Sequence, residues 1–135
     1  IVAITDATGS AGRGEQRIRS VGDRMVGLSG DDSTALELMQ FGGKGNISVT
    51  ANVAPKAMSE TFSAGLRGDF DAAHKVHDVV KHLHRDLFIE SSPIPVKYAL
   101  HKMGMIDTGI RLPLVWLAEK HHATIDEALI RANLL

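Results

Sequence analysis

The stretch from Met25 to Ala51 constrains the fold more than any other part of the sequence, because it predicts a strand, a helix and a second strand in close succession. A short apolar run, Met25 to Ser29, is followed by polar turn residues, and apolar residues then recur at helical spacing up to Gly42-Gly43. The β-branched residues of Asn46 to Thr50 favour a second strand. Two strands joined by a helical crossover must lie parallel, and parallel strands are usually covered on both faces. We therefore expect an α/β fold in which helices cover a parallel sheet.

Two further strand–helix units flank this stretch. The segment Ile1 to Ile4 predicts a buried strand, and Arg13 to Val21 predicts a surface helix with a narrow apolar stripe. Beyond the strand at Asn46 to Thr50, Pro55 is well placed to begin a helix that ends at Gly68-Asp69. Parallel units in series fit part of a (β/α)₈ barrel better than a closed domain of this length. Because a core strand at the first residue has no preceding turn, we expect the chain to be one part of a larger fold.

The second half of the sequence predicts helices only. Apolar residues spaced i, i+3, i+4 and i+7 indicate one long amphipathic helix over 69–87. Two further helices are expected at Val96 to Met103 and at Thr124 to Leu135, the latter capped by its first residue. We therefore divide the chain into a partial barrel, 1–68, and a C-terminal helical region, 69–135.

Composition excludes several classes of function. The formal net charge of −1 provides no broad basic surface for phosphate backbones, and aromatic residues are scarce, so nucleic acid is not an expected partner. The absence of cysteine rules out disulfides, thiol nucleophiles and cysteine metal sites. No apolar run approaches the ~18 residues of a membrane span, and the first residues carry no basic leader. We expect a cytoplasmic protein without a membrane partner.

In a barrel of this kind the functional site lies at the C-terminal ends of the strands. The residues there are Thr5, Asp6, Thr8, Ser29, Gly30, Asp31, Asp32, Ile47, Ser48 and Thr50. The adjacent carboxylates Asp31 and Asp32 can form a metal or acid–base pair, but at a helix start they are more typical of a cap, which we assign to Asp32 or Ser33. Backbone N–H groups at Ser29-Gly30 can bind an anion, or the residues can form an ordinary turn, and the sequence leaves both interpretations open.

The histidines and glycines also suggest sites that we do not favour. Five of the seven histidines fall in or near the helical region: His74, His77, His82, His84 and His101. Because no compact ligand spacing is present, and no carboxylate obviously completes a shell around His77 and His84, we predict a solvated helix face and no metal. Gly9, Gly12 and Gly14 follow the reverse of the dinucleotide-binding order, so no cofactor loop is assigned. Trp116 is expected to pack against the C-terminal helices.

Four short segments carry a family resemblance. Leu28-Ser29-Gly30-Asp31-Asp32 and Gly45-Asn46-Ile47-Ser48-Val49-Thr50-Ala51-Asn52-Val53 closely resemble the 4-hydroxy-tetrahydrodipicolinate synthase (dihydrodipicolinate synthase) family. Ile94-Pro95-Val96-Lys97 and Arg111-Leu112-Pro113-Leu114 match its C-terminal helical region. The resemblance covers the whole chain but only the second half of the family sequence. It implies strands six to eight of a (β/α)₈ barrel followed by C-terminal helices.

The resemblance also implies a chemistry. In this family of lyases, pyruvate forms a Schiff base with a lysine on strand six, and the resulting enamine attacks aspartate semialdehyde in the biosynthesis of diaminopimelate and lysine. The family pattern Ile-Lys-Glu/Asp-Ala-Thr-Gly corresponds here to Ile4-Thr5-Asp6-Ala7-Thr8-Gly9, so Thr5 stands at the lysine position. Gly30 and Ile47 match positions that line the pyruvate pocket through the backbone. The family implies a cytoplasmic homotetramer that needs no cofactor.

Thr5 decides between the possible interpretations of what the chain does. A hydroxyl can form neither an imine nor the electron sink that an imine provides, so the chain alone is not expected to catalyse the family reaction. We favour a fragment or altered form of a synthase, because the pocket floor is retained. The alternatives are a non-catalytic half-barrel module for binding or structure, and another pyruvate aldolase such as N-acetylneuraminate lyase, against which Asn46 to Val53 argues. Unpaired strand edges should make the chain self-associate or bind a missing N-terminal half-barrel.

Overall fold

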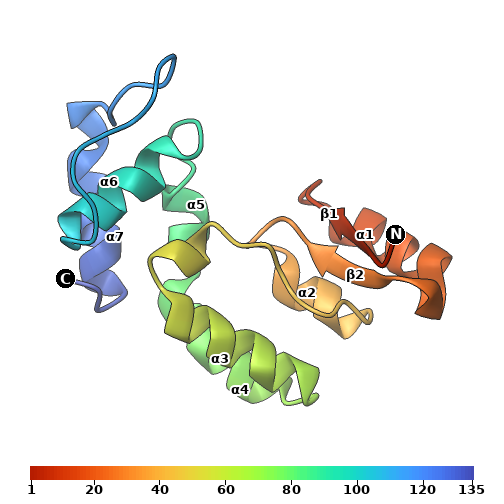
Figure 1. Cartoon of the computed structure of the whole chain (residues 1–135). Coiled ribbons are helices and arrows are strands. Elements are labelled where there is room, and N and C mark those ends of the chain that lie inside the picture. Colours follow the sequence, from red (N-terminus) through yellow and green to blue (C-terminus); the bar gives the residue numbers. More distant parts are fainter.

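A computed structural model describes residues 1–135, and its strands lie at one end of an open arrangement of helices (Figure 1). β1 (Ala3–Asp6) and β2 (Val26–Ser29) run parallel, joined by α1 (Ala11–Val21). β1 begins two residues later than the sequence predicted, and Ile1 and Val2 are exposed rather than buried. The parallel crossover confirms an α/β arrangement.

The third predicted strand, Asn46 to Thr50, is largely wrong. Extended backbone does continue the sheet beside β2: Lys44 N donates to Gly27 O at 2.8 Å, and Ile47 N donates to Ser29 O at 2.8 Å. The only bridge, however, joins Ser29 to Asn46, and Thr50–Asn52 forms a short 3₁₀ helix. The ladder does not reach Thr50, whose amide donates to the side chain of Asp32 instead, as described for the site below.

Three helices follow the sheet. α2 (Ala35–Gln40) is short, and α3 (Pro55–Leu66) begins at the proline as predicted. α3 packs along α4 (Phe70–Val80), and the two lie side by side in Figure 1. The side chain of Asp69 caps α4 by accepting a hydrogen bond from Ala72 N at 3.0 Å. Leu66, the last residue of α3, is 57% exposed.

The single long helix predicted over 69–87 is broken. α4 ends at Val80, and after two turn residues a separate short helix, α5 (Leu83–Asp86), continues the chain. The apolar spacing survives the break, since Val80, Leu83 and Leu87 are all buried in one core. Periodicity alone therefore did not reveal the turn.

The C-terminal helices are α6 (Ile94–Lys102) and α7 (His122–Arg131). α7 begins two residues before Thr124, so the predicted cap is wrong; a 3₁₀ helix at Glu119–His121 leads directly into it. Trp116 packs as predicted: its ring lies 5.6 Å from that of His101, centroid to centroid, beside the main core.

Two clusters of buried apolar side chains hold the helices together. The larger one draws on residues from Val53 to Ala132, and the smaller one joins α2 to α3 and α4 through Leu36, Met39, Ala64 and Ala73. Both clusters cross residue 68, and the division of the chain there stays a prediction. None of the helices combines the length and the apolar character that a membrane span requires.

Candidate functional site

The two faces of the sheet have different surroundings. Side chains alternate along a strand, so Asp6 and Thr5 of β1 point to opposite faces. α1 covers the face of Asp6, where Arg17 Nε lies 2.9 Å from Asp6 Oδ2, and Ile18 fills the space beside Gly27. No helix covers the other face, and Thr5 is exposed there. Thr5, which the sequence predicts to stand at the lysine position, therefore lies on the open face.

The open face brings together the three residues matched to the family site. A Cβ atom added at Gly30 would lie 3.0 Å from Thr5 Cγ2 and 2.8 Å from Ala7 Cβ. Because Ser29 bridges Asn46, the next residues, Gly30 and Ile47, are also neighbours across the ladder. Ile47 is 63% exposed. Thr5, Gly30 and Ile47 thus form one exposed surface at the C-terminal ends of the sheet, which we call the strand-end surface.

The backbone amides of this surface are already used. Gly30 N donates to Asp6 O at 2.7 Å, and Ile47 N donates to Ser29 O at 2.8 Å. Asp31 N donates to Ser29 Oγ at 3.1 Å. These N–H groups are therefore not free to form the anion cradle that the sequence left open. The Thr5 hydroxyl remains as a hydrogen-bond donor on the strand-end surface.

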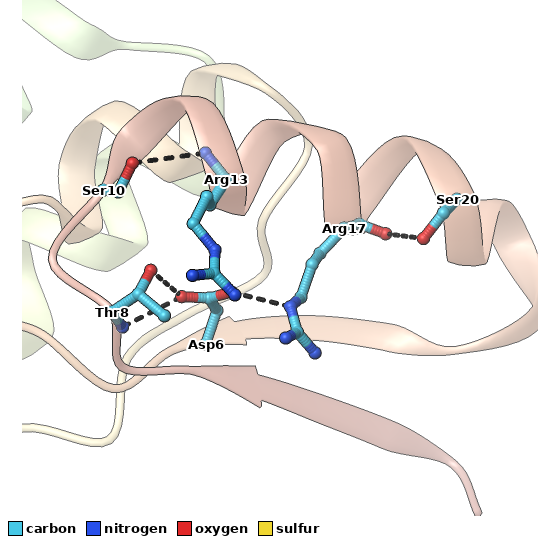
Figure 2. A network of polar contacts seen from close by, with 6 residues as sticks. All are labelled: Asp6, Thr8, Ser10, Arg13, Arg17 and Ser20. Carbon is cyan, nitrogen blue, oxygen red and sulfur yellow. Dashed lines mark hydrogen bonds and ion pairs between the residues drawn. The ribbon is translucent and has the colours of Figure 1, made fainter.

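A network around Asp6 fixes the end of β1 (Figure 2). Asp6 Oδ1 accepts hydrogen bonds from Thr8 N at 3.0 Å and from Thr8 Oγ1 at 2.6 Å, while Oδ2 faces Arg17 on α1. The side-chain and backbone hydrogen bonds from Thr8 lower the pKa of Asp6 below its usual value, and Arg17 and Arg13 lower it further. Asp6 is therefore a carboxylate at neutral pH that ties β1 to α1.

Asp31 holds the turn before α2. Its Oδ2 accepts hydrogen bonds from Ser33 Oγ at 2.6 Å and from Thr34 N at 3.0 Å. Burial raises the pKa of Asp31, but the bonds from Ser33 and Thr34 outweigh it and hold the pKa below its usual value. Thr34 occupies the cap position of α2 without a side-chain hydrogen bond, so the cap assigned to Asp32 or Ser33 is wrong.

Asp32 acts between elements instead. It is only 4% exposed, and its two carboxylate oxygens accept hydrogen bonds from two residues of the segment 46–50. Oδ1 accepts from Asn46 Nδ2 at 2.5 Å, and Oδ2 accepts from Thr50 N at 2.9 Å. Because the Thr50 amide donates to Asp32, it takes no part in strand pairing at the end of the predicted third strand.

A histidine that the sequence placed on a solvated face completes this network. His84 of α5 is only 7% exposed, so that prediction is wrong for it. Its Nδ1 lies 2.8 Å from Thr50 Oγ1, and its Nε2 lies 3.1 Å from His77 Nε2. Burial lowers the pKa of His84 to about 4, although Asp32 opposes the shift, so the ring is neutral at neutral pH.

The sequence contained one signal for this pair, the seven-residue spacing of His77 and His84. It could not show that the break after α4 turns His84 toward Thr50. No group of three or more His, Cys, Asp or Glu side chains is placed to hold a metal ion.

We expect Gly30→Ala to destabilise the fold by about 1–3 kcal/mol, because the new methyl group would displace Thr5 and Ala7. Gly12→Ala is the matched control, since nothing lies within 4 Å of a Cβ there and the residue is inside α1. The control should stabilise the fold by about 0.5–1 kcal/mol. Urea unfolding midpoints compare the two variants. Equal midpoints would contradict the contact between Gly30 and Thr5.

Comparison with known proteins gives consistent matches along the chain. The model of the dihydrodipicolinate synthetase family matches residues 1–132. The chain is 84% identical over 135 residues to 4-hydroxy-tetrahydrodipicolinate synthase of Psychrobacter arcticus, covering all of this chain and 45% of that relative. It is 53% identical to the enzyme of the same name from Pseudomonas aeruginosa, over all of this chain and 46% of that protein.

Solved structures agree. The chloride-inhibited dihydrodipicolinate synthase of Acinetobacter baumannii, complexed with pyruvate, superposes with a TM-score of 0.97 at 51% identity, over 100% of this chain and 46% of that one. The dihydrodipicolinate synthase of Aquifex aeolicus gives a TM-score of 0.94 at 39% identity, over 99% of this chain and 46% of that one. The chain thus spans about half the length of the relatives it matches.

Proposed function

The chain belongs to the dihydrodipicolinate synthetase family, which is a family of lyases, and we propose that it provides the pyruvate-binding C-terminal part of a 4-hydroxy-tetrahydrodipicolinate synthase. In this proposal, residues 1–68 supply strands six to eight of a (β/α)₈ barrel, and residues 69–135 are its C-terminal helical region. The complete enzyme condenses pyruvate with aspartate semialdehyde in lysine biosynthesis. As in the family resemblance, it would be a cytoplasmic homotetramer.

The observation that carries this proposal is the contact between Thr5 and Gly30. Thr5, proposed at the lysine position, lies on β1, and Gly30, a proposed pocket residue, directly follows β2, yet a Cβ at Gly30 would approach Thr5 Cγ2 to 3.0 Å. Ile47 lies across the ladder from Gly30 on the same face. A small ligand on the strand-end surface would therefore contact all three residues. The pyruvate in the related A. baumannii structure supports pyruvate as this ligand.

Thr5 limits what the site can do. Without an amine it cannot form the imine on which the family chemistry depends, so we propose non-covalent binding and no catalysis by this chain alone. The Thr5 hydroxyl would donate a hydrogen bond to a ligand oxygen, while Gly30 and Ile47, whose amides are bonded within the sheet, would line the site by van der Waals contact. The same substitution is the observation that favours a second candidate, a half-barrel retained for binding or structure without catalysis.

The partner we propose is the missing half-barrel. β1 pairs with β2 on one edge only, which leaves its other edge unpaired. At the N-terminal end of the sheet, between the end of α1 and the start of β2, Val2, Ile18, Val26 and Phe41 help to line an open cavity of about 510 Å³. An unpaired strand edge and exposed apolar side chains each favour association. An N-terminal half-barrel would pair with the free edge of β1, and a second copy of the chain would do so in its absence.

Titration with pyruvate tests where the ligand binds. We expect pyruvate to shift the amide NMR signals of Thr5, Gly30 and Ile47, with weak affinity because much of the pocket is absent. Thr5→Val has a similar shape but no hydroxyl, and it should bind at least about threefold more weakly if the hydroxyl contributes a hydrogen bond. Signals that shift only beyond Asp69 would contradict this placement.

A further inference from the structure

We propose that His84, on α5 of the C-terminal helical region, is a positioning residue: it holds Thr50 and so fixes the segment 46–50 that carries Ile47 to the strand-end surface. The proposal rests on the proposed function only in treating this segment as substrate-facing. His84 itself does not touch the strand-end surface, so its effect on a ligand would pass through Thr50.

The segment needs support because the sheet releases it early. The last ladder bond that it makes to β2 is Ile47 N to Ser29 O, at 2.8 Å. After Ile47 the backbone turns, with Ser48 Oγ accepting a hydrogen bond from Ala51 N at 2.9 Å. Thr50 is then fully buried and is held from two sides, by Asp32 at its amide and by His84 at its hydroxyl. These two bonds anchor the end of the segment.

The donors and acceptors fit only one arrangement without leaving a buried hydrogen unpaired. A neutral imidazole has one N–H group and one acceptor nitrogen. If the Thr50 hydroxyl donates to His84 Nδ1, then His84 Nε2–H donates to His77 Nε2, and the hydrogens of both Thr50 and His84 are used. In the opposite direction His84 Nδ1–H donates to Thr50 Oγ1, and the hydroxyl hydrogen has no acceptor. His84 therefore acts as the acceptor for Thr50.

The anchor is part of a buried helix. His84 is itself buried, and Leu83 before it and Leu87 after it are both fully buried in the larger core. A side chain held by buried neighbours keeps its rotamer, so it transmits the position of α5 to Thr50. The helical region would in this way set the place of a pocket segment 34 residues earlier in the sequence.

Hydrogen exchange of the full chain tests the holding role. In His84→Leu, and in Thr50→Val, we expect the amides of segment 46–50 to exchange about tenfold faster, because one buried hydrogen bond is lost. His84→Asn should restore slow exchange, since its side-chain oxygen can accept from Thr50. His74→Leu is the matched control, because His74 is exposed on the neighbouring α4. Equal exchange of the segment in His84→Leu, Thr50→Val and the control would overturn the proposal.

A second measurement tests whether the position of the segment 46–50 affects the binding of a ligand. Each variant is combined with Thr5→Lys and with the N-terminal half of a close relative, and steady-state kinetics are measured with pyruvate. We expect His84→Leu to raise the KM for pyruvate about five- to tenfold with kcat changed less than twofold, and His84→Asn to reverse most of the rise. An unchanged KM in an active enzyme would overturn the positioning role.

The two proposals fail differently. If the complemented Thr5→Lys parent has no activity while segment 46–50 still exchanges faster in His84→Leu, the proposed function fails and the holding role of His84 stands. If His84→Leu unfolds the whole chain, Thr50→Val decides, because it removes the same hydrogen bond without changing α5. Slow exchange of the segment in Thr50→Val would then overturn the proposal.

Discussion

Thr5→Lys, combined with the N-terminal half of the Psychrobacter arcticus relative, is expected to form a pyruvate adduct that borohydride traps, whereas the unchanged chain with the same half forms none. The difference should be all or none, because only an amine can condense with the ketone to give an imine. The lysine would stand beside Gly30, because a Cβ atom added at Gly30 would lie 3.0 Å from the methyl carbon of Thr5. This is the most direct test of the proposed function.

Complementation is essential to that result. A Schiff-base lysine must lose its proton near neutral pH although its free pKa is about 10.4, which requires burial and suitable neighbours. Thr5 is exposed on the open face of this chain, so the N-terminal half of the relative must supply that burial. Thr5→Lys in the isolated chain should therefore give no adduct.

Intact mass and peptide mass spectrometry after reduction identify the adduct and its site. The measurement compares four samples: the unchanged and Thr5→Lys chains, each with and without the N-terminal half. Size-exclusion chromatography shows whether the halves have assembled. A trapped adduct at Thr5 in the unchanged chain, or no adduct in the assembled Thr5→Lys protein, would refute the proposal.

Leu83→Ala should cause a large loss of stability. Leu83 is completely buried in the core that joins α4, α5 and the C-terminal helices. Removing three carbon atoms there loses their transfer free energy and leaves a cavity, which costs about 3–5 kcal/mol in the free energy of unfolding. The same change also disturbs the residue next to His84.

Leu66→Ala provides the matched control, because it makes the same chemical change at a leucine that is 57% exposed on α3. We expect an effect within about 0.5 kcal/mol there. Urea unfolding followed by circular dichroism at equal protein concentration measures both. Similar midpoints for the two variants would show that the core around Leu83 does not support the fold as described.

Much of the local structure could be predicted from the sequence. The apolar run before Gly30 became β2, the helical spacing after it became α2, and Pro55 began α3. These features depend on neighbours within a few residues: side-chain periodicity, turn residues and the fixed backbone of proline. The family resemblance also depended on short local motifs, and the comparisons bear it out.

The sequence by itself therefore determined the family and the α/β class, and it predicts that Thr5 stands at the lysine position. Only the tertiary structure decided which backbone and side-chain groups are engaged in hydrogen bonds. The amides of Gly30 and Ile47 are used by the sheet, Asp32 reaches Thr50 instead of capping α2, and the break after α4 buries His84. A hydrogen bond depends on distance and direction between groups 18 or 34 residues apart, and local periodicity carries no information about either.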